Sequence, residues 1–184
     1  TTTLEGWKLF WTNERIIMAQ DAASSIPGYA YEVTARGDLI PLARAILGLT
    51  ILPHNSSMTL LIGSDTGSLA LSVRTATSSI ALPIKTIPEK CVWTSDTTLM
   101  LYCAVPERIT SKLFLDDWYR GIYHTEDSLW RVDGRTGETE LFLAPLSEMS
   151  LSLDVIHPLV DDRGEYLAFM NAVDQSLWIL RIVP

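Results

Sequence analysis

The sequence predicts an all-β protein built from a repeated unit of four antiparallel strands. Runs of alternating apolar and polar residues, rich in β-branched and aromatic side chains, are separated at short intervals by turn residues. A strand motif recurs, so that Tyr29, Leu69, Leu129 and Leu177 occupy equivalent positions 40, 60 and 48 residues apart. Without one long loop, the period is about 40–45 residues, the length of one four-stranded β-propeller blade. We therefore expect a β-propeller of about four antiparallel blades.

The first unit begins with a hairpin over Trp7–Gln20, in which two short apolar runs flank a polar turn. Strands are expected next at Tyr29–Val33 and Leu39–Leu42, separated by a turn that contains glycine. We expect Ala43–Leu47 to form about one helical turn, because a glycine follows it and glycine commonly ends a helix.

The second and third units each supply four strand signals. In the second unit the strands are expected at Leu49–Leu52, Met58–Ile62, Ser68–Arg74 and Ile80–Ile84. In the third unit they are expected at Lys90–Trp93, at Leu99–Ala104 and in the two arms of a hairpin over Asp127–Leu143. The long loop Val105–Glu126 interrupts the third unit.

The fourth unit has signals for three strands. After the connector Ala144–Ser152, strands are expected at Leu153–Leu159, Tyr166–Asn171 and Ser176–Ile182. The resulting blades cover approximately residues 7–44, 49–86, 89–145 and 153–184. Because an open ring leaves sheet edges exposed, we expect either half of a larger ring from a longer protein or a ring completed by oligomerisation.

The segment Asp162–Phe169, continued after a loop by Ser176–Trp178, resembles the WD40-like repeats of TolB-type propellers. In those repeats a Pro-Asp-Gly turn precedes Leu-Ala-Phe, and a later Leu-Trp precedes a Thr-Gly-Glu turn. The fourth unit resembles the first part, although Arg163 is inserted and Asp161 stands where proline is usual.

The third unit resembles the second part of the same pattern, in Leu129–Asp133 and Thr136–Glu138. The first two units depart from it, since Ala70 stands where the tryptophan would be. The resemblance implies blades and hairpin turns. It also implies functions that are mostly binding and scaffolding, with some family members serving as gating domains fused to peptidases.

Two cysteines fall in one expected hairpin of the third unit. Cys91 and Cys103 are both six residues from residue 97, so a turn centred near Asp96–Thr97 would make them cross-strand partners. One interpretation is a disulfide, which favours a periplasmic or extracellular location. The other is a pair of reduced thiols packed as small apolar side chains.

The loop Val105–Glu126 carries the candidate partner-binding residues. Loops of this length are uncommon unless they are functional or disordered, and this one is too aromatic for disorder. Its side chains include the types that dominate protein interfaces, at Phe114, Trp118, Tyr119, Arg120, Tyr123 and His124. The alternative is a loop that folds back over its own blade and buries these aromatic residues.

Several function classes find no support in the sequence. The net charge of −8 and the absence of a basic patch argue against a nucleic-acid partner. No apolar run reaches about 18 residues, so we expect no membrane insertion. No glycine-rich nucleotide loop or Gly-x-Ser-x-Gly elbow is present. His54, His124 and His157 lack metal-ligand spacing, so we expect neither metal nor cofactor.

Three functional hypotheses follow. The first is a non-catalytic module that binds a protein or structural partner through the loop at residues 105–126. The second is a carbohydrate-active enzyme, a glycosidase or lyase, with carboxylates at the centre of the ring. The third is a purely structural assembly unit that self-associates through open sheet edges.

Overall fold

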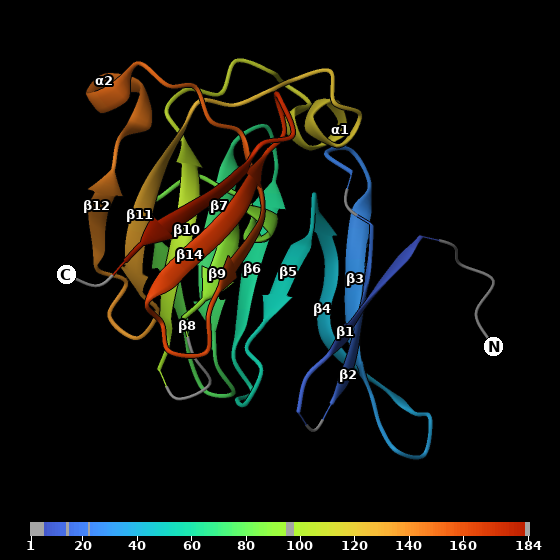
Figure 1. Ribbon diagram of the computed structural model, residues 1–184. Coiled ribbons are helices and arrows are strands. Elements are labelled where there is room, and N and C mark those ends of the chain that lie inside the picture. Colours follow the sequence, from blue (N-terminus) through green and yellow to red (C-terminus); the bar gives the residue numbers. More distant parts are fainter. Residues whose placement is uncertain (1–5, 14, 22, 95–97, 183–184) are drawn as a thin grey trace.

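The structure is an all-β protein with few helices. It is a computed structural model that describes residues 6–13, 15–21, 23–94 and 98–182. The strands of these ranges form four antiparallel sheets of three or four strands (Figure 1). Each sheet pairs its strands in the order in which they occur in the sequence, so each sheet is a simple meander.

The strand bounds are as follows. The first sheet contains β1 (Trp7–Trp11), β2 (Ile16–Gln20), β3 (Pro27–Val33) and β4 (Leu39–Leu47). The second contains β5 (Thr50–Pro53), β6 (Leu60–Asp65), β7 (Leu69–Arg74) and β8 (Ser79–Leu82). The third contains β9 (Cys91–Trp93), β10 (Met100–Pro106), β11 (Asp127–Asp133) and β12 (Thr139–Leu143). The fourth contains β13 (Val155–Val160), β14 (Tyr166–Asn171) and β15 (Leu177–Arg181).

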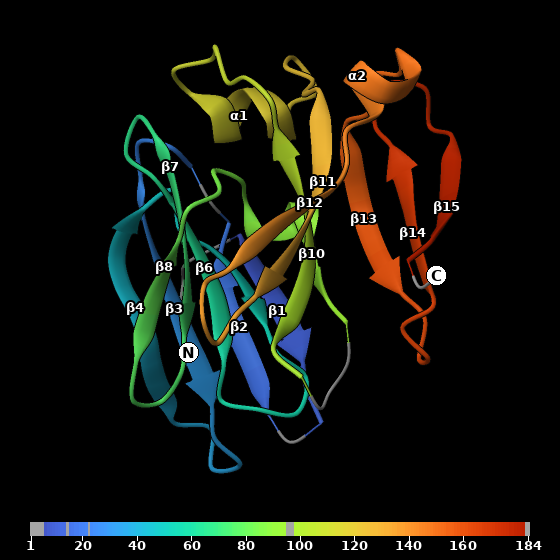
Figure 2. The ribbon, with the colours of Figure 1, turned by 90° about the vertical axis from the view of Figure 1, so that its left-hand side faces the viewer.

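Short helices occupy the connections. The 3-10 helix η1 (Pro88–Lys90) precedes β9, α1 (Phe114–Tyr119) lies in the long loop of the third unit, and α2 (Pro145–Met149) joins the third sheet to the fourth. Figure 2 shows α1 and α2 at the same end of the molecule. In the described part of the chain, no helix has the length and apolar character needed to cross a membrane.

Successive sheets pack face to face, and a hydrophobic cluster fills each space between them. The alternation of β10 illustrates the arrangement. Leu101 and Cys103 belong to the cluster shared with the second sheet, whereas Tyr102 and Ala104 belong to the cluster shared with the fourth. The third sheet is therefore covered on both faces.

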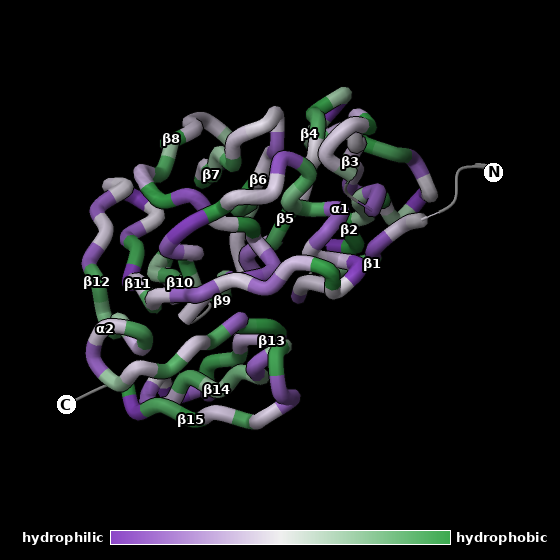
Figure 3. Tube along the Cα trace, turned by 90° about the horizontal axis from the view of Figure 1, so that it is seen from above, coloured by the Kyte–Doolittle hydropathy of each residue, from purple (hydrophilic) through white to green (hydrophobic). Residues whose placement is uncertain are grey.

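The sheets fan out around a common region when viewed along the strands. Figure 3 shows the first strand of each sheet toward the middle (β1, β5, β9 and β13) and the last strand toward the outside (β4, β8, β12 and β15). The helix η1 contacts β5 and β13, which places it near the middle of the fan. Loops at the ends of the inner strands are thereby brought together from sheets far apart in the sequence.

The helical turn expected at Ala43–Leu47 is wrong. These residues continue β4 and pair with β3, with Pro27 opposite Leu47 and Gly28 opposite Ile46. The register shifts nearby, and Ala45 takes a φ of 53°. Helix propensity is a weak preference that pairing with a neighbouring strand and burial of Ala43 against the second sheet override here.

The two cysteines are cross-strand partners in the third sheet. Cys91 of β9 lies opposite Cys103 of β10, and a disulfide joins them with a Cα–Cα distance of 4.1 Å. The turn expected at Asp96–Thr97 lies outside the described residues. Both half-cystines belong to the cluster between the second and third sheets, so the bond is buried.

Candidate functional site

The long loop of the third unit folds down onto the sheet ends instead of extending into solvent. Phe114 and Leu115 of α1 are buried in a cluster with Leu69 and Ile87. The hydroxyl of Tyr123 accepts a hydrogen bond from the backbone N–H of Thr110 at 3.1 Å. The loop is thus packed against the sheet ends.

The six candidate partner-binding residues divide into two groups. Phe114 is 2% exposed and its ring packs into the protein interior. This contradicts the expectation that Phe114 lies on a partner surface. Trp118 and Tyr123 are half-buried. The exposed members are Tyr119, Arg120 and His124. They are joined by Ile122, which is 70% exposed. We call Tyr119, Arg120, Ile122 and His124 the rim surface.

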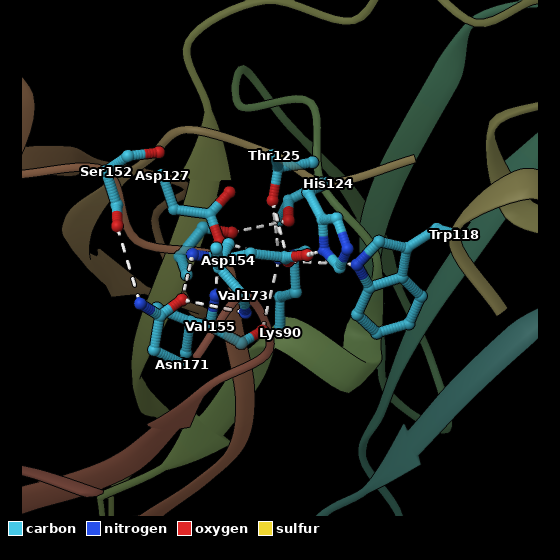
Figure 4. Close-up of polar contacts among 12 residues, drawn as sticks. Lys90, Trp118, His124, Thr125, Asp127, Ser152, Asp154, Val155, Asn171 and Val173 are labelled. Carbon is cyan, nitrogen blue, oxygen red and sulfur yellow. Dashed lines mark hydrogen bonds and ion pairs between the residues drawn. The ribbon is translucent and has the colours of Figure 1, made fainter. Parts of the chain in front are cut away.

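Beneath the rim surface lies a buried ammonium with two carboxylates. Lys90 is the last residue of η1 and is fully buried. Its Nζ lies 2.6 Å from Asp127 Oδ2 and 2.6 Å from Asp154 Oδ1 (Figure 4). It also donates to Thr125 Oγ1 at 2.9 Å and to the carbonyl oxygen of Val155 at 3.1 Å. We call Lys90, Asp127 and Asp154 the lysine cluster.

The lysine cluster connects the third sheet to the fourth. Asp127 begins β11, whereas Asp154 precedes β13, so Lys90 joins two sheets through one side chain. The backbone N–H of Val155 also donates to Asp127 Oδ2 at 2.8 Å. A buried charge is tolerated only when it is paired and hydrogen-bonded, and these contacts meet that requirement for Lys90.

The two carboxylates of the cluster have different electrostatic environments. Burial raises the pKa of Asp127, against the attraction of Lys90, and its Oδ1 is buried without a hydrogen-bond partner in the described part of the chain. Burial also acts to raise the pKa of Asp154. There, Lys90 and hydrogen bonds from Trp118 and His124 outweigh it and hold the pKa below its usual value.

Asp154 ties the rim to the lysine cluster. Trp118 Nε1 donates to Asp154 Oδ1 at 2.9 Å, and His124 Nδ1 lies 2.9 Å from Asp154 Oδ2 (Figure 4). The ammonium of Lys90 lies 5.0 Å from the ring centroid of Trp118. A buried carboxylate therefore orients His124 of the rim surface and the neighbouring Trp118.

A pocket of about 470 Å³ opens beside these residues. It is lined by side chains and backbone from distant segments, including the first sheet, η1, α1 and the fourth sheet, at Lys8, Glu89, Trp118, Tyr119, Gly121, His124, Asp154, Ile156, His157, Ala172 and Gln175. His157 has a φ of 52° at an irregularity in β13, where the pairing with β14 shifts between Ile156 and Leu159. Strained backbone of this kind persists only where surrounding structure holds it.

At one side of the pocket, Lys8 and Tyr119 share the carboxylate of Glu89. Lys8 Nζ lies 3.2 Å from Glu89 Oε1, and the hydroxyl of Tyr119 donates to the same oxygen at 2.5 Å. Tyr119 is 40% exposed as a whole, but desolvation around its hydroxyl, followed by the Glu89 charge, raises its pKa, so the hydroxyl remains protonated and acts as a donor. These contacts join β1 to the rim surface.

The carboxylates beside the pocket are paired with ammonium groups of the same chain. Within the described ranges, no group of three or more His, Cys, Asp or Glu side chains is arranged to hold a metal ion. Asp127 and Asp154 are close together, but both are buried and bonded to the same ammonium. A pair engaged in this way cannot serve as the free acid and base that glycoside cleavage needs.

Sequence reasoning found part of this site. It singled out Trp118, Tyr119 and His124, which do line the pocket. It missed Lys90, Asp127, Asp154 and Glu89, which are spread over the third and fourth units without any motif spacing. The sequence offers no signal for them, because a single charged residue beside a strand is most often exposed.

Comparisons with known proteins add little to this description. No family model matches the sequence, and no curated protein matches it. A solved structure described as "Crystal structure of the eukaryotic initiation factor" is similar at a TM-score of 0.48 and 9% identity. The alignment covers 96% of this chain and 43% of that chain, so the chain spans less than half of its length. A likeness this weak carries no argument about fold or function.

Proposed function

We propose that the chain forms four blades of a β-propeller of the TolB-type, WD40-like kind and that it acts as a non-catalytic protein-binding module. The radial order of the strands and the cluster between each pair of successive sheets support the propeller. The Leu-Trp pair of the Ser-Leu-Trp motif lies on the third strand of both the third and the fourth sheet, which supports the resemblance. The disulfide supports an extracytoplasmic location.

The observation that carries the binding function is the rim surface itself. Tyr119, Arg120 and Ile122 are exposed. They lie at and just after the end of α1, which Phe114 and Leu115 anchor in the interior. Tyrosine and arginine are enriched at interface hot spots, and a prearranged surface lowers the entropic cost of binding. The loop therefore combines the expected fold-back with an exposed contact surface.

The test is a paired affinity-capture experiment. Arg120→Ala with Ile122→Ser alters the rim surface, and Arg36→Ala with Met58→Ser is the matched control. Arg36 and Met58 are exposed in the turns after β3 and β5, at the other ends of the strands (Figure 1). Proteins enriched on the wild type should be lost with the rim variant and retained by the control. Equal recovery on both variants would refute the proposal.

A second function, self-association, is favoured by the two outer faces of the stack. Phe10 packs toward the second sheet, so its neighbours Leu9 and Trp11 point away and are 71% and 81% exposed. In the fourth sheet Trp178 points inward, and the neighbours Leu177 and Ile179 are 66% and 63% exposed. These are the faces on which a further sheet would pack, from a second copy or from additional blades.

The oligomeric state of the chain tests this second function. Light scattering after size exclusion should show a mass above that of one chain at high protein concentration. Leu177→Ser with Ile179→Ser should return the mass to that of a monomer, while the rim variant should leave it unchanged. A compact wild-type monomer at all concentrations would rule self-association out.

A further inference from the structure

One ammonium group lies at the pocket and another is buried behind it, and both are held in the same manner. Lys8 Nζ lies 3.2 Å from a carboxylate oxygen of Glu89 and 4.6 Å from the ring centroid of Tyr119. Lys90 Nζ lies 2.6 Å from a carboxylate oxygen of Asp154 and 5.0 Å from the ring centroid of Trp118. A carboxylate beside an aromatic ring is an arrangement that attracts organic cations.

The charges around the pocket are unbalanced. Two carboxylates line it, those of Glu89 and Asp154, and Asp21 lies 4.0 Å from Lys8 Nζ. Among the lysines and arginines of the described residues, Lys8 lines the pocket, whereas Arg120 is exposed beside it. The remaining negative charge agrees in sign with the whole chain, whose net charge is −8. A cation entering the pocket is therefore favoured over an anion.

One acceptor at the pocket is unused. Glu89 Oε1 accepts from Lys8 and Tyr119, whereas Glu89 Oε2 is buried and has no hydrogen-bond partner in the part of the chain that the structure describes. An acceptor left in this state is costly, and a small rotation of the carboxylate offers it to a donor in the pocket.

Lys8 is the weaker of the two internal cations. Its side chain is 38% exposed, whereas Lys90 is fully buried. Exposed ion pairs contribute little to stability, so an incoming cation can displace the Lys8 ammonium at small cost. Lys8 is thus a cation of the protein itself that lines the pocket and that an incoming cation can replace.

We propose that this pocket receives an arginine or lysine side chain of the partner protein and that Lys8 competes with it for Glu89 and Tyr119. The proposal rests on the proposed function, because the rim surface would contact the same partner around the pocket. It assigns the chemical class of the contacting residue, a basic side chain, which the rim surface alone does not specify.

The probes are three small molecules titrated into the ¹⁵N-labelled protein. One is a capped pentapeptide with arginine between glycine pairs, one is the same peptide with neutral citrulline, and one is agmatine, a free guanidine. The readouts are the indole N–H signal of Trp118 and the amide signal of Gly121, two residues that line the pocket. The arginine peptide should shift both signals, and the citrulline peptide should not.

The variants change the affinity in opposite directions. Glu89→Gln should lower the affinity for the arginine peptide roughly tenfold, because a charged hydrogen bond is lost. Lys8→Ala should raise the affinity for the arginine peptide by about two- to fivefold, because the competing exposed ion pair with Glu89 is removed. Glu138→Gln and Lys85→Ala make the same charge changes at exposed residues outside the pocket and should leave the affinity within about twofold.

Three results would overturn the proposal. Equal binding of the citrulline peptide would show that the positive charge of the ligand is not recognised. Weaker binding of the arginine peptide by Lys8→Ala would indicate an anionic ligand. Agmatine binding as tightly as the peptide would point to a small free organic cation instead of a partner side chain. If Glu89→Gln does not fold, the Lys8→Ala and citrulline results still decide. If the peptide results fail but the rim variant still loses its partner in affinity capture, the further inference is wrong and the proposed function is retained.

Discussion

Replacing Lys90 with methionine tests the lysine cluster most directly. The side chain of Lys90 is fully buried, and its ammonium contacts Asp127, Asp154, Thr125 and the carbonyl of Val155. Methionine has a similar length but no charge, so Lys90→Met retains the packing and removes the ammonium. The Asp127 and Asp154 carboxylates would then remain buried beside each other without that partner.

The expected cost is large. Removing one partner of a buried ion pair typically costs about 3–5 kcal/mol, because the remaining charge is left uncompensated. We expect Lys90→Met to lower the free energy of unfolding by about that amount, a large part of the roughly 5–15 kcal/mol that stabilises a domain. Urea unfolding followed by the fluorescence of the six tryptophans measures the change.

Two further variants make this result interpretable. Lys85→Met alters an exposed lysine and should change stability by no more than about 0.5 kcal/mol. Adding Asp127→Asn and Asp154→Asn to Lys90→Met should recover much of the lost stability, because the buried charges are then gone. A loss below about 1 kcal/mol for Lys90→Met, or no recovery in the triple variant, would refute the electrostatic reasoning.

Three other predictions concern stability. Replacing Cys91 and Cys103 with alanine should cost about 2–4 kcal/mol in urea unfolding, and reducing agent should then have no further effect. Phe169→Ala should cost about 3–5 kcal/mol by the same measurement, because its ring is 1% exposed between the third and fourth sheets. Asp154, whose folded pKa is lowered, contributes stability that is present above its unfolded pKa of about 3.8 and is lost as pH falls through its folded value. Asp127, whose folded pKa is raised, has the opposite effect, so stability falls as pH rises from about 3.8 through its folded pKa, and each Asn variant should remove its own part of the pH profile.

The strand pattern could be predicted because it is local. The Ser-Leu-Trp motif predicts that Leu129 and Leu177 are equivalent, and both lie on the third strand of their sheets. The cross-strand relation of Cys91 and Cys103 could likewise be predicted by counting from a turn. Alternation and turn residues act over a few positions, so one sequence contains enough information for both.

Errors arose where tertiary contacts outweigh local preference. The segment Ala43–Leu47 has helix-favouring residues, yet pairing with β3 holds it in a strand. The side chain of Phe114 was expected at a partner surface because its residue type is common in interfaces. Its burial depends on Leu69 and Ile87, which belong to other segments of the chain.

The lysine cluster lay beyond sequence reasoning for a related reason. Lys90 and Asp154 are separated by 64 residues and meet because the third sheet packs on the fourth. Taken singly, each reads as an ordinary surface charge beside a strand. Only the register and packing of two sheets show that these charges are buried, so the site depends on the three-dimensional arrangement.

The meander order of every sheet has a consequence for how the chain acquires its structure. Because each strand pairs with a strand that precedes or follows it directly in sequence, pairing within a sheet closes only short loops, apart from the long loop between β10 and β11. We expect the first two sheets to form while the later part of the chain is still being synthesised. Protease protection of ribosome-bound chains in which residue 82 has left the exit tunnel would detect this, and protection that appears only with the full chain would contradict it.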